Sequence, residues 1–500
     1  MQNVRSEMGS SRLATYAPKL RNMECGQSIA VALAGMVIAA GCATIRPAEG
    51  FRDVRESLGE RTGARVEWRG VTAGDCAVGD AVAAMLGAEL SVDQAVQVAL
   101  LNNRSLQAIY EDLGVAQADV VQAGLLRNPV FELTVRWPDE SPHSPNVEVA
   151  VVQDFLDVFF IPARKQVAAA QFEAAQRRVA HEVLRLAADV REAFYDLQAA
   201  QHARDVMRDL VIATEAAAEA ARRLRAAGNI TDLALARHEA ADAQARLELM
   251  SNDAQVTVAR ERLARLMGVS GGSLLWTVAA RLPELPSSEP PTGDVETLAV
   301  ARRLDVQAAR RDAVALADAS QLANSTRYLS EAEIGADAER ETEGTWLVGP
   351  RVSAPLPLFD QGQASLARAR AQARRAHQRH LAADNDARAE VRTAVAQLAA
   401  ARARAEHFTR VVLPLRARVI EQAQLEYNGM LIGVFELLET KRAQIEAQRQ
   451  YVDALRAYWV ARSELERAAG GRLPEGHAPP ATVPATAPAA QPQPDHQHHH

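Results

Sequence analysis

Two groups of carboxylates are the residues of this 500-residue chain that point most directly to a chemistry, the attraction of cations. Glu436 and Glu439 lie three residues apart, and this spacing places both side chains on one face of a helix. The second group alternates with other residues in short segments, so its members share the polar face of predicted strands. These residues are Glu132, Glu148, Glu333, Asp337 and Glu339.

A cysteine near the N-terminus is a candidate for lipid attachment. Basic residues precede an apolar run over 29–40, which has the length of a signal-peptide core, and small residues stand directly before Cys42. The pattern is typical of a bacterial lipobox, in which the cysteine is acylated and anchors the mature chain to a membrane. An ordinary secretory signal with an incidental cysteine is the alternative.

Histidines at the C-terminus are candidates for metal binding. The imidazoles of four residues can bind copper or zinc: His496, His498, His499 and His500. The surrounding Pro, Ala, Thr and Gln composition predicts a disordered tail, and its flexibility argues against a high-affinity site. An appended tag is the other explanation.

Composition and missing motifs argue against other classes of function. The formal net charge of −7 argues against a nucleic-acid binder, which usually carries a basic face. We find no phosphate loop, dinucleotide-binding glycine motif, paired-cysteine metal motif or zinc-protease helix. We therefore expect no enzyme and no cofactor. Only 4% of the residues are aromatic, which favours long, closely packed helices over a thick core.

Periodicity divides the chain into five segments. We expect a signal peptide with a lipobox over 1–41, an irregular lipid-anchored arm over 42–90, structural repeats over 91–285 and 286–470, and a disordered Pro/Ala/His-rich tail over 471–500. Each repeat begins with helices, the first being one helix from Ser91 to about Leu126 opened by a capping box. A β-hairpin follows, at about 130–156 and about 331–356. A long helical hairpin then follows, at about 163–268 and about 363–469.

The duplication can be checked by the offset between matching residues. Val190-Arg191 lies 201 residues before Val391-Arg392, while Leu263 and Gly268 lie 202 residues before Leu465 and Gly470. Such steady offsets are hard to explain by shared alanine content alone, so we interpret the chain as two copies of one plan. Two thin helical hairpins bury little surface by themselves, and lateral partners are therefore expected.

The combination resembles the TolC-type outer-membrane efflux channels over about 91–470. The most specific stretch is 427–439, which matches the second periplasmic hairpin turn of the family. Met430 stands here in the usual glycine place, and Gly429 comes one residue early. Two segments, 125–129 entering the first strand and 354–359 leaving the fourth, are similar to the heavy-metal branch that exports cobalt, zinc, cadmium and copper.

The resemblance implies a mainly α fold with a small β part. Long helical hairpins would form a periplasmic tunnel, and each protomer would give four strands to a trimeric 12-stranded outer-membrane β-barrel. The implied partners are two further copies, a periplasmic adaptor (membrane fusion protein), an inner-membrane RND pump and outer-membrane lipid, with no nucleic acid. A lipid-anchored protein in the outer membrane, extending into the periplasm, is expected.

The resemblance also assigns roles to residues. Glu436 and Glu439 take the place of the carboxylates that ring the closed periplasmic entrance, and an ordinary exposed helix face is the alternative. The strand carboxylates would line the pore and favour cations, although acidic strand faces are also common on any solvated sheet. The hairpin tips would contact the adaptor: Gly228, Asn229, Asp232, Gly429, Met430 and Gly433.

Three functions remain open at this point. The first is passive conduction of heavy-metal cations such as copper, zinc or cobalt, within a tripartite RND-type system. The second is efflux of drugs or organic solutes by a channel of the same family. The third is a periplasmic adaptor or coiled-coil scaffold without a pore, which would normally show one hairpin flanked by compact β-domains. Two hairpins, each preceded by a strand pair, favour the channel.

Overall fold

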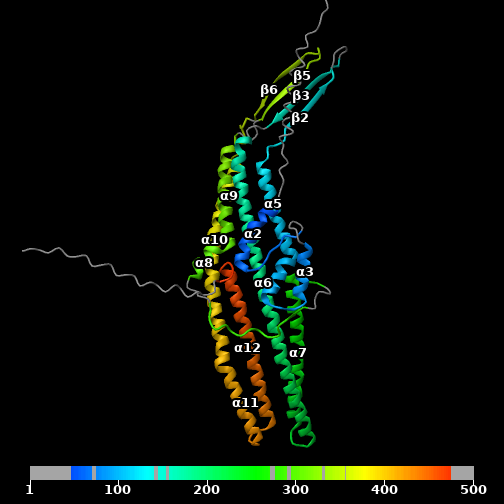
Figure 1. Cartoon of the computed structure of the whole chain (residues 1–500), viewed down its shortest axis with the longest axis vertical. Coiled ribbons are helices and arrows are strands. Elements are labelled where there is room, and N and C mark those ends of the chain that lie inside the picture. Colours follow the sequence, from blue (N-terminus) through cyan, green and yellow to red (C-terminus); the bar gives the residue numbers. More distant parts are fainter. Residues whose placement is uncertain are drawn as a thin grey trace, which may run out of the picture. The chain divides into compact units, whose positions relative to one another are not determined.

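The computed structural model describes residues 47–69, 75–139, 145–153, 157–270, 276–289, 294–328, 333–354 and 356–473, with only the backbone at 47–49, 75–77 and 157. The expected signal segment, Cys42 and the four C-terminal histidines lie outside these residues. In the described part, the chain is mainly helical and has a small antiparallel sheet (Figure 1).

The N-terminal arm is folded, and the expectation of irregular backbone over 42–90 is wrong for much of it. It contains helices α2 (Pro47–Thr62) and α3 (Asp75–Leu86) and the short strand β1 (Glu89–Leu90), which pairs in parallel with β4 (Thr277–Val278). Phe51, Val54 and Leu58 form the buried stripe of α2. The centroid of the Phe51 ring lies 4.9 Å from that of Tyr110 in the first repeat, so an aromatic contact joins the arm to that repeat.

The first repeat opens with two helices where one was predicted. The capping box at Ser91 and Gln94 is confirmed and begins α4 (Val92–Asn102). Asn103 then ends α4 and caps α5 (Arg104–Gly124), because its side-chain oxygen accepts from the Leu106 N–H at 2.9 Å. The predicted continuous helix to Leu126 is therefore wrong at Asn103.

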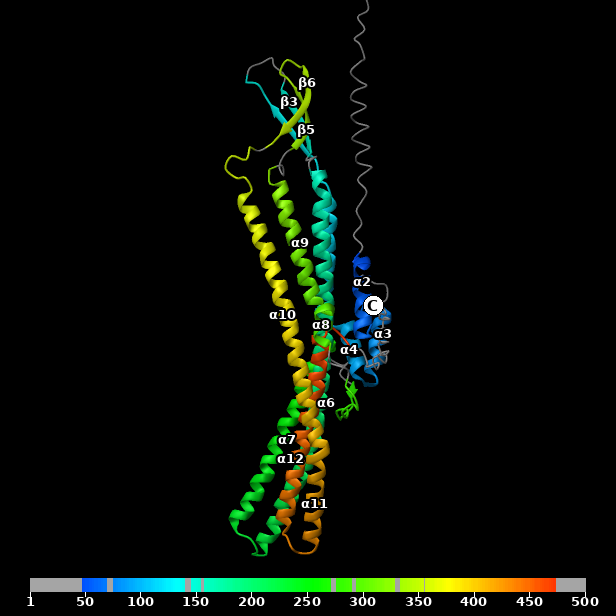
Figure 2. The ribbon, with the colours of Figure 1, turned by 90° about the vertical axis from the view of Figure 1, so that its left-hand side faces the viewer.

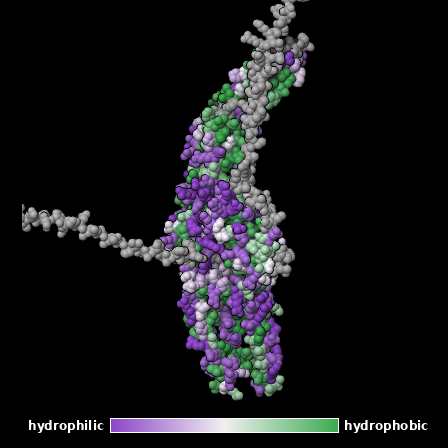
Figure 3. All heavy atoms as spheres, viewed as in Figure 1, coloured by the Kyte–Doolittle hydropathy of each residue, from purple (hydrophilic) through white to green (hydrophobic). Residues whose placement is uncertain are grey.

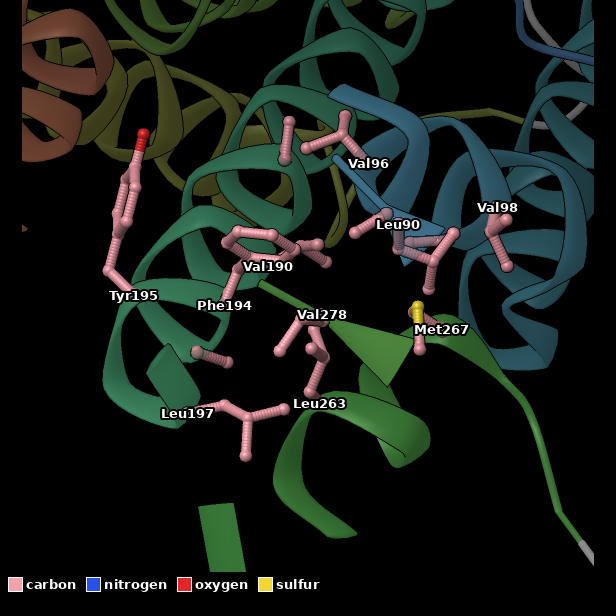
Figure 4. Close-up of a cluster of buried hydrophobic side chains, with 14 of the residues drawn as sticks. Leu90, Val96, Val98, Val190, Phe194, Tyr195, Leu197, Leu263, Met267 and Val278 are labelled. Atoms are coloured by element: carbon pink, nitrogen blue, oxygen red, sulfur yellow. The ribbon is translucent and has the colours of Figure 1, made fainter. Parts of the chain in front are cut away.

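The first helical hairpin consists of α6 (Asp157–Ala226) and α7 (Asp232–Met267). At 70 residues, α6 is about 105 Å long. It starts before Pro162, whereas the prediction started after it. Near its middle, Val190, Phe194 and Leu197 are buried and face α7 and the arm in the cluster shown in Figure 4.

The second repeat follows the same order with one interruption. It contains α8 (Val295–Arg302), α9 (Leu304–Thr326), α10 (Gln363–His407), the π-helical segment η2 (Phe408–Val412), α11 (Leu413–Asn428) and α12 (Val434–Ala468). The predicted unbroken helix from Gln363 to Tyr427 is wrong at η2. Pro414 lies two residues after this segment, in the first turn of α11, and lacks the N–H that a regular α-helix needs, which accounts for the wider turn.

The duplication is visible where each long hairpin returns to the start of its repeat. Gly268 ends α7 with φ 67°, and a Cβ there would lie 2.5 Å from the Asn102 carbonyl oxygen. Gly470 follows α12 with φ 81°, and its Cβ would lie 3.2 Å from the backbone of Arg302 and Arg303. Both returning helices thus end against the break between the two short helices of their own repeat.

The prediction of a disordered tail from residue 471 fails for its first three residues, and residues 474–500 lie outside the part of the chain that the structure describes. The Arg472 N–H donates to the Arg61 carbonyl at 3.1 Å, and Leu473 is buried. The Arg61 guanidinium also donates to the Arg302 and Gly470 carbonyls. The arm therefore holds residues 471–473 in place, and the prediction of disorder there is wrong.

The helices pack side by side in two groups that share α6 and α10. Near the sheet, α5 packs on α6, α6 on α9, and α9 on α10. Toward the hairpin turns, α7 packs on α6, α6 on α12, and α12 on both α10 and α11 (Figures 1 and 2). Each group therefore has two flanks. One flank is α5 near the sheet and α7 toward the hairpin turns. The other is α10, continued by α11 toward the turns.

The sheet has four antiparallel strands in the order β2–β3–β5–β6. These are β2 (Val130–Arg136), β3 (Asn146–Gln153), β5 (Glu333–Arg340) and β6 (Trp346–Ser353). β3 and β5 join the two repeats in the centre of the sheet, with Val149 opposite Ala338. β2 and β6 are its edges, and each has a side with no strand partner in the described part of the chain.

Candidate functional site

The strand register places all five predicted carboxylates on one face of the sheet. Glu148 lies opposite Glu339, and Ala150 lies opposite both Glu132 and Asp337. Glu333 falls on the same face. It lies two residues before Gly335, which is opposite Val152, and Val152 shares its face with Ala150 because the two are two residues apart in one strand. Side chains that share a face in one register also face the same environment, so these carboxylates form one acidic surface.

The sequence analysis did not include the arginines on this acidic face. Arg136 contacts Glu148 at 3.4 Å, and Arg351 contacts Glu132 at 3.4 Å. The Asn146 amide also donates to the Glu339 carboxylate at 2.6 Å. Both arginines follow the same two-residue alternation as the carboxylates, which places them on this face but does not say which carboxylate each one contacts. Five carboxylates against two guanidinium groups leave a net charge of −3 on this face.

The sheet curls toward its acidic face. Arg351 on β6 reaches Glu132 on β2, although these strands are the two edges of the sheet and a flat sheet would separate them by about 14 Å. Gly335 supports the curvature, since a Cβ there would lie 2.5 Å from the Val151 carbonyl oxygen of the neighbouring strand. The concave face of the sheet is therefore the polar one.

The opposite face of the sheet is apolar. It carries Phe131, Leu133, Val149, Ile334, Val348 and Val352, among others. All six are exposed except Val149, which is half-buried, and Val348 is 74% exposed. In Figure 3, hydrophobic residues gather over the β2–β3 part of the sheet. An exposed apolar surface of this extent marks a site of contact with lipid or protein.

Large aromatic side chains lie at both ends of this sheet. Trp137 follows β2, and Trp346 begins β6, at the end away from the helices. Phe159 and Phe359 lie at the other end, next to the strand–helix junctions, and Phe359 is 94% exposed. Aromatic residues at the two borders of an apolar surface are typical of the interfaces of a bilayer.

The first hairpin tip joins α6 to α7. Gly228 has φ 76°, and the Asn229 N–H donates back to the Leu224 carbonyl, so the turn caps the end of α6. Asp232 accepts two hydrogen bonds from Arg225, at 2.5 and 3.0 Å. Asp232 is one of the three residues predicted here to contact a partner, and it therefore also stabilises the turn.

The second tip joins α11 to α12 and contains a strained residue. Met430 has φ 58°, in the left-handed region that favours glycine, and is 92% exposed. Gly429 has φ −79°, so it does not supply this conformation. Gly433 caps α12 in extended backbone. The glycine-requiring position of the turn is therefore the one that Met430 occupies.

Met430→Gly is expected to stabilise this tip by about 1 kcal/mol, because glycine adopts the left-handed region without a Cβ clash. Hydrogen exchange of amides 426–433 in the full-length protein measures the effect, with slower exchange expected in the variant. Gly429→Ala is the matched control and should leave exchange nearly unchanged. Faster exchange in Met430→Gly would contradict the assignment of strain.

Glu436 and Glu439 lie on the first turns of α12 and are both exposed. Neither carboxylate has an ion pair within the described residues. Beside them, the His238 ring of α7 stacks on the Phe435 ring, with centroids 4.0 Å apart and planes 16° apart. This stack links the two hairpins close to their tips. No sequence pattern indicates it, because α7 and α12 belong to different repeats.

The link between the tips is expected to weaken in acid. Burial lowers the pKa of His238, although Glu439 acts in the opposite direction. Because its folded pKa lies below the unfolded value, the neutral ring contributes stability above about pH 6.5, which is lost as the pH falls through the folded pKa. Exchange rates of amides 434–440, corrected for intrinsic rates, should rise between pH 7 and pH 5. His238→Phe keeps the stack without titration and should remove this rise; an equal rise in the variant would exclude His238 as its cause.

Two searches bear on the chemistry of the described residues. None of their helices combines the length and the apolar character that crossing a bilayer would require. Nor do the described residues bring three or more His, Cys, Asp or Glu side chains into a group that could hold a metal ion. The carboxylates of the sheet form an extended charged surface rather than a ligand cage.

Comparison with known proteins defines the class. Residues 95–269 match the sequence model of the family described as outer membrane efflux protein. The match covers most of the first repeat, and together with the fold it indicates an efflux protein of the outer membrane.

Particular relatives support the same conclusion. The chain is 24% identical over 386 residues to the cobalt-zinc-cadmium resistance protein CzcC of Cupriavidus metallidurans, covering 76% of this chain and 90% of that protein. The CmeC outer membrane channel of Campylobacter jejuni matches 77% of this chain and 87% of its own, at 13% identity and a TM-score of 0.65. The MtrE outer membrane channel of Neisseria gonorrhoeae matches 76% and 89%, at 17% identity and a TM-score of 0.60. The two structural matches show the fold.

Proposed function

We propose that the protein is the outer-membrane channel of a tripartite efflux system and conducts its cargo passively. The observation that carries the proposal is the curled sheet, which has an acidic concave face and an apolar convex face bordered by aromatic residues. In a bilayer, the convex face would contact lipid and the concave face would contact water. The helical hairpins attached to the sheet would continue the path on the periplasmic side.

The open sheet edges support an assembly of three copies. A four-stranded sheet in lipid would leave the hydrogen-bonding groups of β2 and β6 unsatisfied on one side, which is costly without water. Pairing β6 of one copy with β2 of the next closes a barrel of twelve strands without an edge. Nine net negative charges would then face its lumen.

The helical flanks toward the hairpin turns support the same arrangement. On α7, Leu247, Met250 and Val258 are exposed, and on α10–α11 the exposed side chains include Val411, Leu415 and Val419. A ring needs two different, complementary faces on each copy. An apolar stripe on each of the two flanks meets that need.

The partners and the anchor follow from the same proposal. The tip residues of both hairpins would contact a periplasmic adaptor, which connects the channel to an inner-membrane pump of the RND type. Glu436 and Glu439 would surround the entrance next to these contacts. Acylated Cys42 would add a lipid anchor in the outer membrane, consistent with the lipobox pattern before it.

We infer that the cargo is a heavy-metal cation, with cobalt, zinc and copper the first candidates. The net negative charge of the concave face favours cations. The name of the Cupriavidus relative, a cobalt-zinc-cadmium resistance protein, points to the same class of cargo. Organic solutes or drugs are the alternative cargo for a channel of this fold.

A deletion strain separates the two cargoes. Growth is measured over series of cobalt, zinc, cadmium, copper and silver salts and of several antibiotics, with plasmid complementation as the control. Loss of tolerance to at least one metal is expected. A strain that loses drug tolerance alone would show that the metal assignment is wrong while leaving the channel itself in place.

A further inference from the structure

The sheet-proximal part of α10 carries a dense group of unpaired cations. Residues 361–383 contain five arginines and two histidines and no acidic residue. Arg368, Arg370, Arg374 and Arg375 are all exposed, and none of them has an ion pair in the described part of the chain. Four uncompensated guanidinium groups within two turns repel one another, so an anionic partner is expected to face them.

The sheet-proximal part of α5 carries the opposite charge. Residues 105–126 contain Glu111, Asp112 and Asp119 and no basic residue. Asp112, Val115 and Asp119 follow one another at helical spacing and form an exposed stripe, in which Val115 is 63% exposed. Neither aspartate has an ion pair among the described residues, whereas Glu111 accepts a hydrogen bond from Trp68.

The two charged stripes match in spacing and in depth. Asp112 and Asp119 lie seven residues apart, as do Arg368 and Arg375. Asp119 lies five residues before Gly124, the end of α5, and Arg368 lies five residues after Gln363, the start of α10. Because α5 runs toward the sheet and α10 runs away from it, antiparallel packing would place Asp119 opposite Arg368 and Asp112 opposite Arg375, about 10 Å further along.

Within one chain these stripes cannot meet. α6 and α9 lie between α5 and α10, which are the two flanks of the helical group near the sheet. We propose that the Arg368–Arg375 stripe of one copy docks on the Asp112–Asp119 stripe of the next copy and sets the register of the ring. This inference rests on the proposed three-copy assembly and adds the charged surface that orients it.

The same flanks bring the sheet edges together in the right order. β2 follows α5, and β6 precedes α10, so a copy that docks α10 on α5 of its neighbour also brings β6 toward β2 of that neighbour. Electrostatic complementarity acts mainly on register and on the rate of association. Matched charges at two depths would prevent a slip of one helical turn, which would pair the strands in the wrong register.

Charge reversal tests the docking in the full-length protein purified in detergent. Arg368→Glu with Arg375→Glu is expected to lower the trimer fraction about tenfold at low salt, measured by light scattering and native electrophoresis. Adding Asp112→Arg and Asp119→Arg to the same chain restores opposite charges at every junction and should recover most of the trimer. Arg52→Glu with Arg65→Glu, two exposed arginines of the arm, is the matched control and should retain the trimer.

The salt dependence of the wild-type trimer provides the second measurement. Its dissociation should become faster between 0.05 and 0.5 M NaCl, and the reversed and restored variants should differ most at the lower concentration. If salt does not change the dissociation of the wild-type trimer and the arginine reversal does not lower the trimer fraction, the docking proposal is wrong. The channel proposal would then still hold. The absence of any trimer from the wild-type protein would instead overturn the assembly itself. Reversal that the α5 changes do not rescue would assign the arginines to another anionic partner, such as lipid headgroups.

Discussion

Replacing Glu436 and Glu439 with alanine is expected to raise the single-channel conductance of the assembled protein roughly two- to tenfold in a planar bilayer. Both carboxylates are exposed on one face of α12 directly after the hairpin turn. Three copies would bring six of them around one axis, where they bind cations and narrow the entrance. The double variant removes both the charge and the bulk.

Divalent cations sharpen this experiment. Millimolar calcium or zinc added on the periplasmic side should reduce the wild-type conductance, and the double variant should lose this block. Glu421→Ala with Glu426→Ala removes two exposed carboxylates from α11 of the same hairpin and is the matched control. Equal conductance in wild type and in the α12 variant would remove Glu436 and Glu439 from the entrance.

Gly335→Val is expected to abolish the assembled channel. A Cβ at this position would lie 2.5 Å from the Val151 carbonyl oxygen and 3.0 Å from the Cα of Val152, both backbone atoms that cannot rotate away. The substitution therefore opposes the pairing of β3 with β5, which joins the two repeats, at a cost of about 3 kcal/mol or more per copy. The heat-resistant trimer and its conductance should both be lost.

Gly349→Val supplies the control for this loss. Gly349 lies on the same polar face, opposite Asp337, but a Cβ there meets no atom within 4 Å. The same change of residue type should therefore leave trimer and conductance close to wild type. If both variants assembled equally well, the close approach at Gly335 would not be needed for the curvature of the sheet.

The sequence predicted the architecture where a simple period governs it. The two-residue alternation of the strands and the helical period of the hairpins located both, and the offset of 202 residues correctly paired Gly268 with Gly470. Prediction failed where a single residue redirects the backbone. Asn103 splits one predicted helix into two, and Pro414 accompanies a π-helical turn inside another.

The arrangement of the candidate site could also be predicted only in part from the sequence. Alternation was enough to put the five strand carboxylates on one face, because that depends only on the pleat. Their arginine partners depend on strand order and curvature, since Arg351 and Glu132 are distant in sequence and lie on opposite edges of the sheet. The stack of His238 on Phe435 depends on how the two hairpins pack against each other.

The reversal potential of the wild-type protein in a planar bilayer tests the central claim most directly. Purified full-length protein is added to a membrane that separates 1 M from 0.1 M KCl, and single steps are recorded. If three copies turn their acidic concave faces inward, we expect discrete conductance steps. Their reversal potential should be shifted from zero toward the equilibrium potential of potassium. Neutralising the acidic face with Glu132→Gln, Asp337→Asn and Glu339→Gln should move that potential toward zero. A protein that produces no steps, or steps that select chloride, would contradict the account.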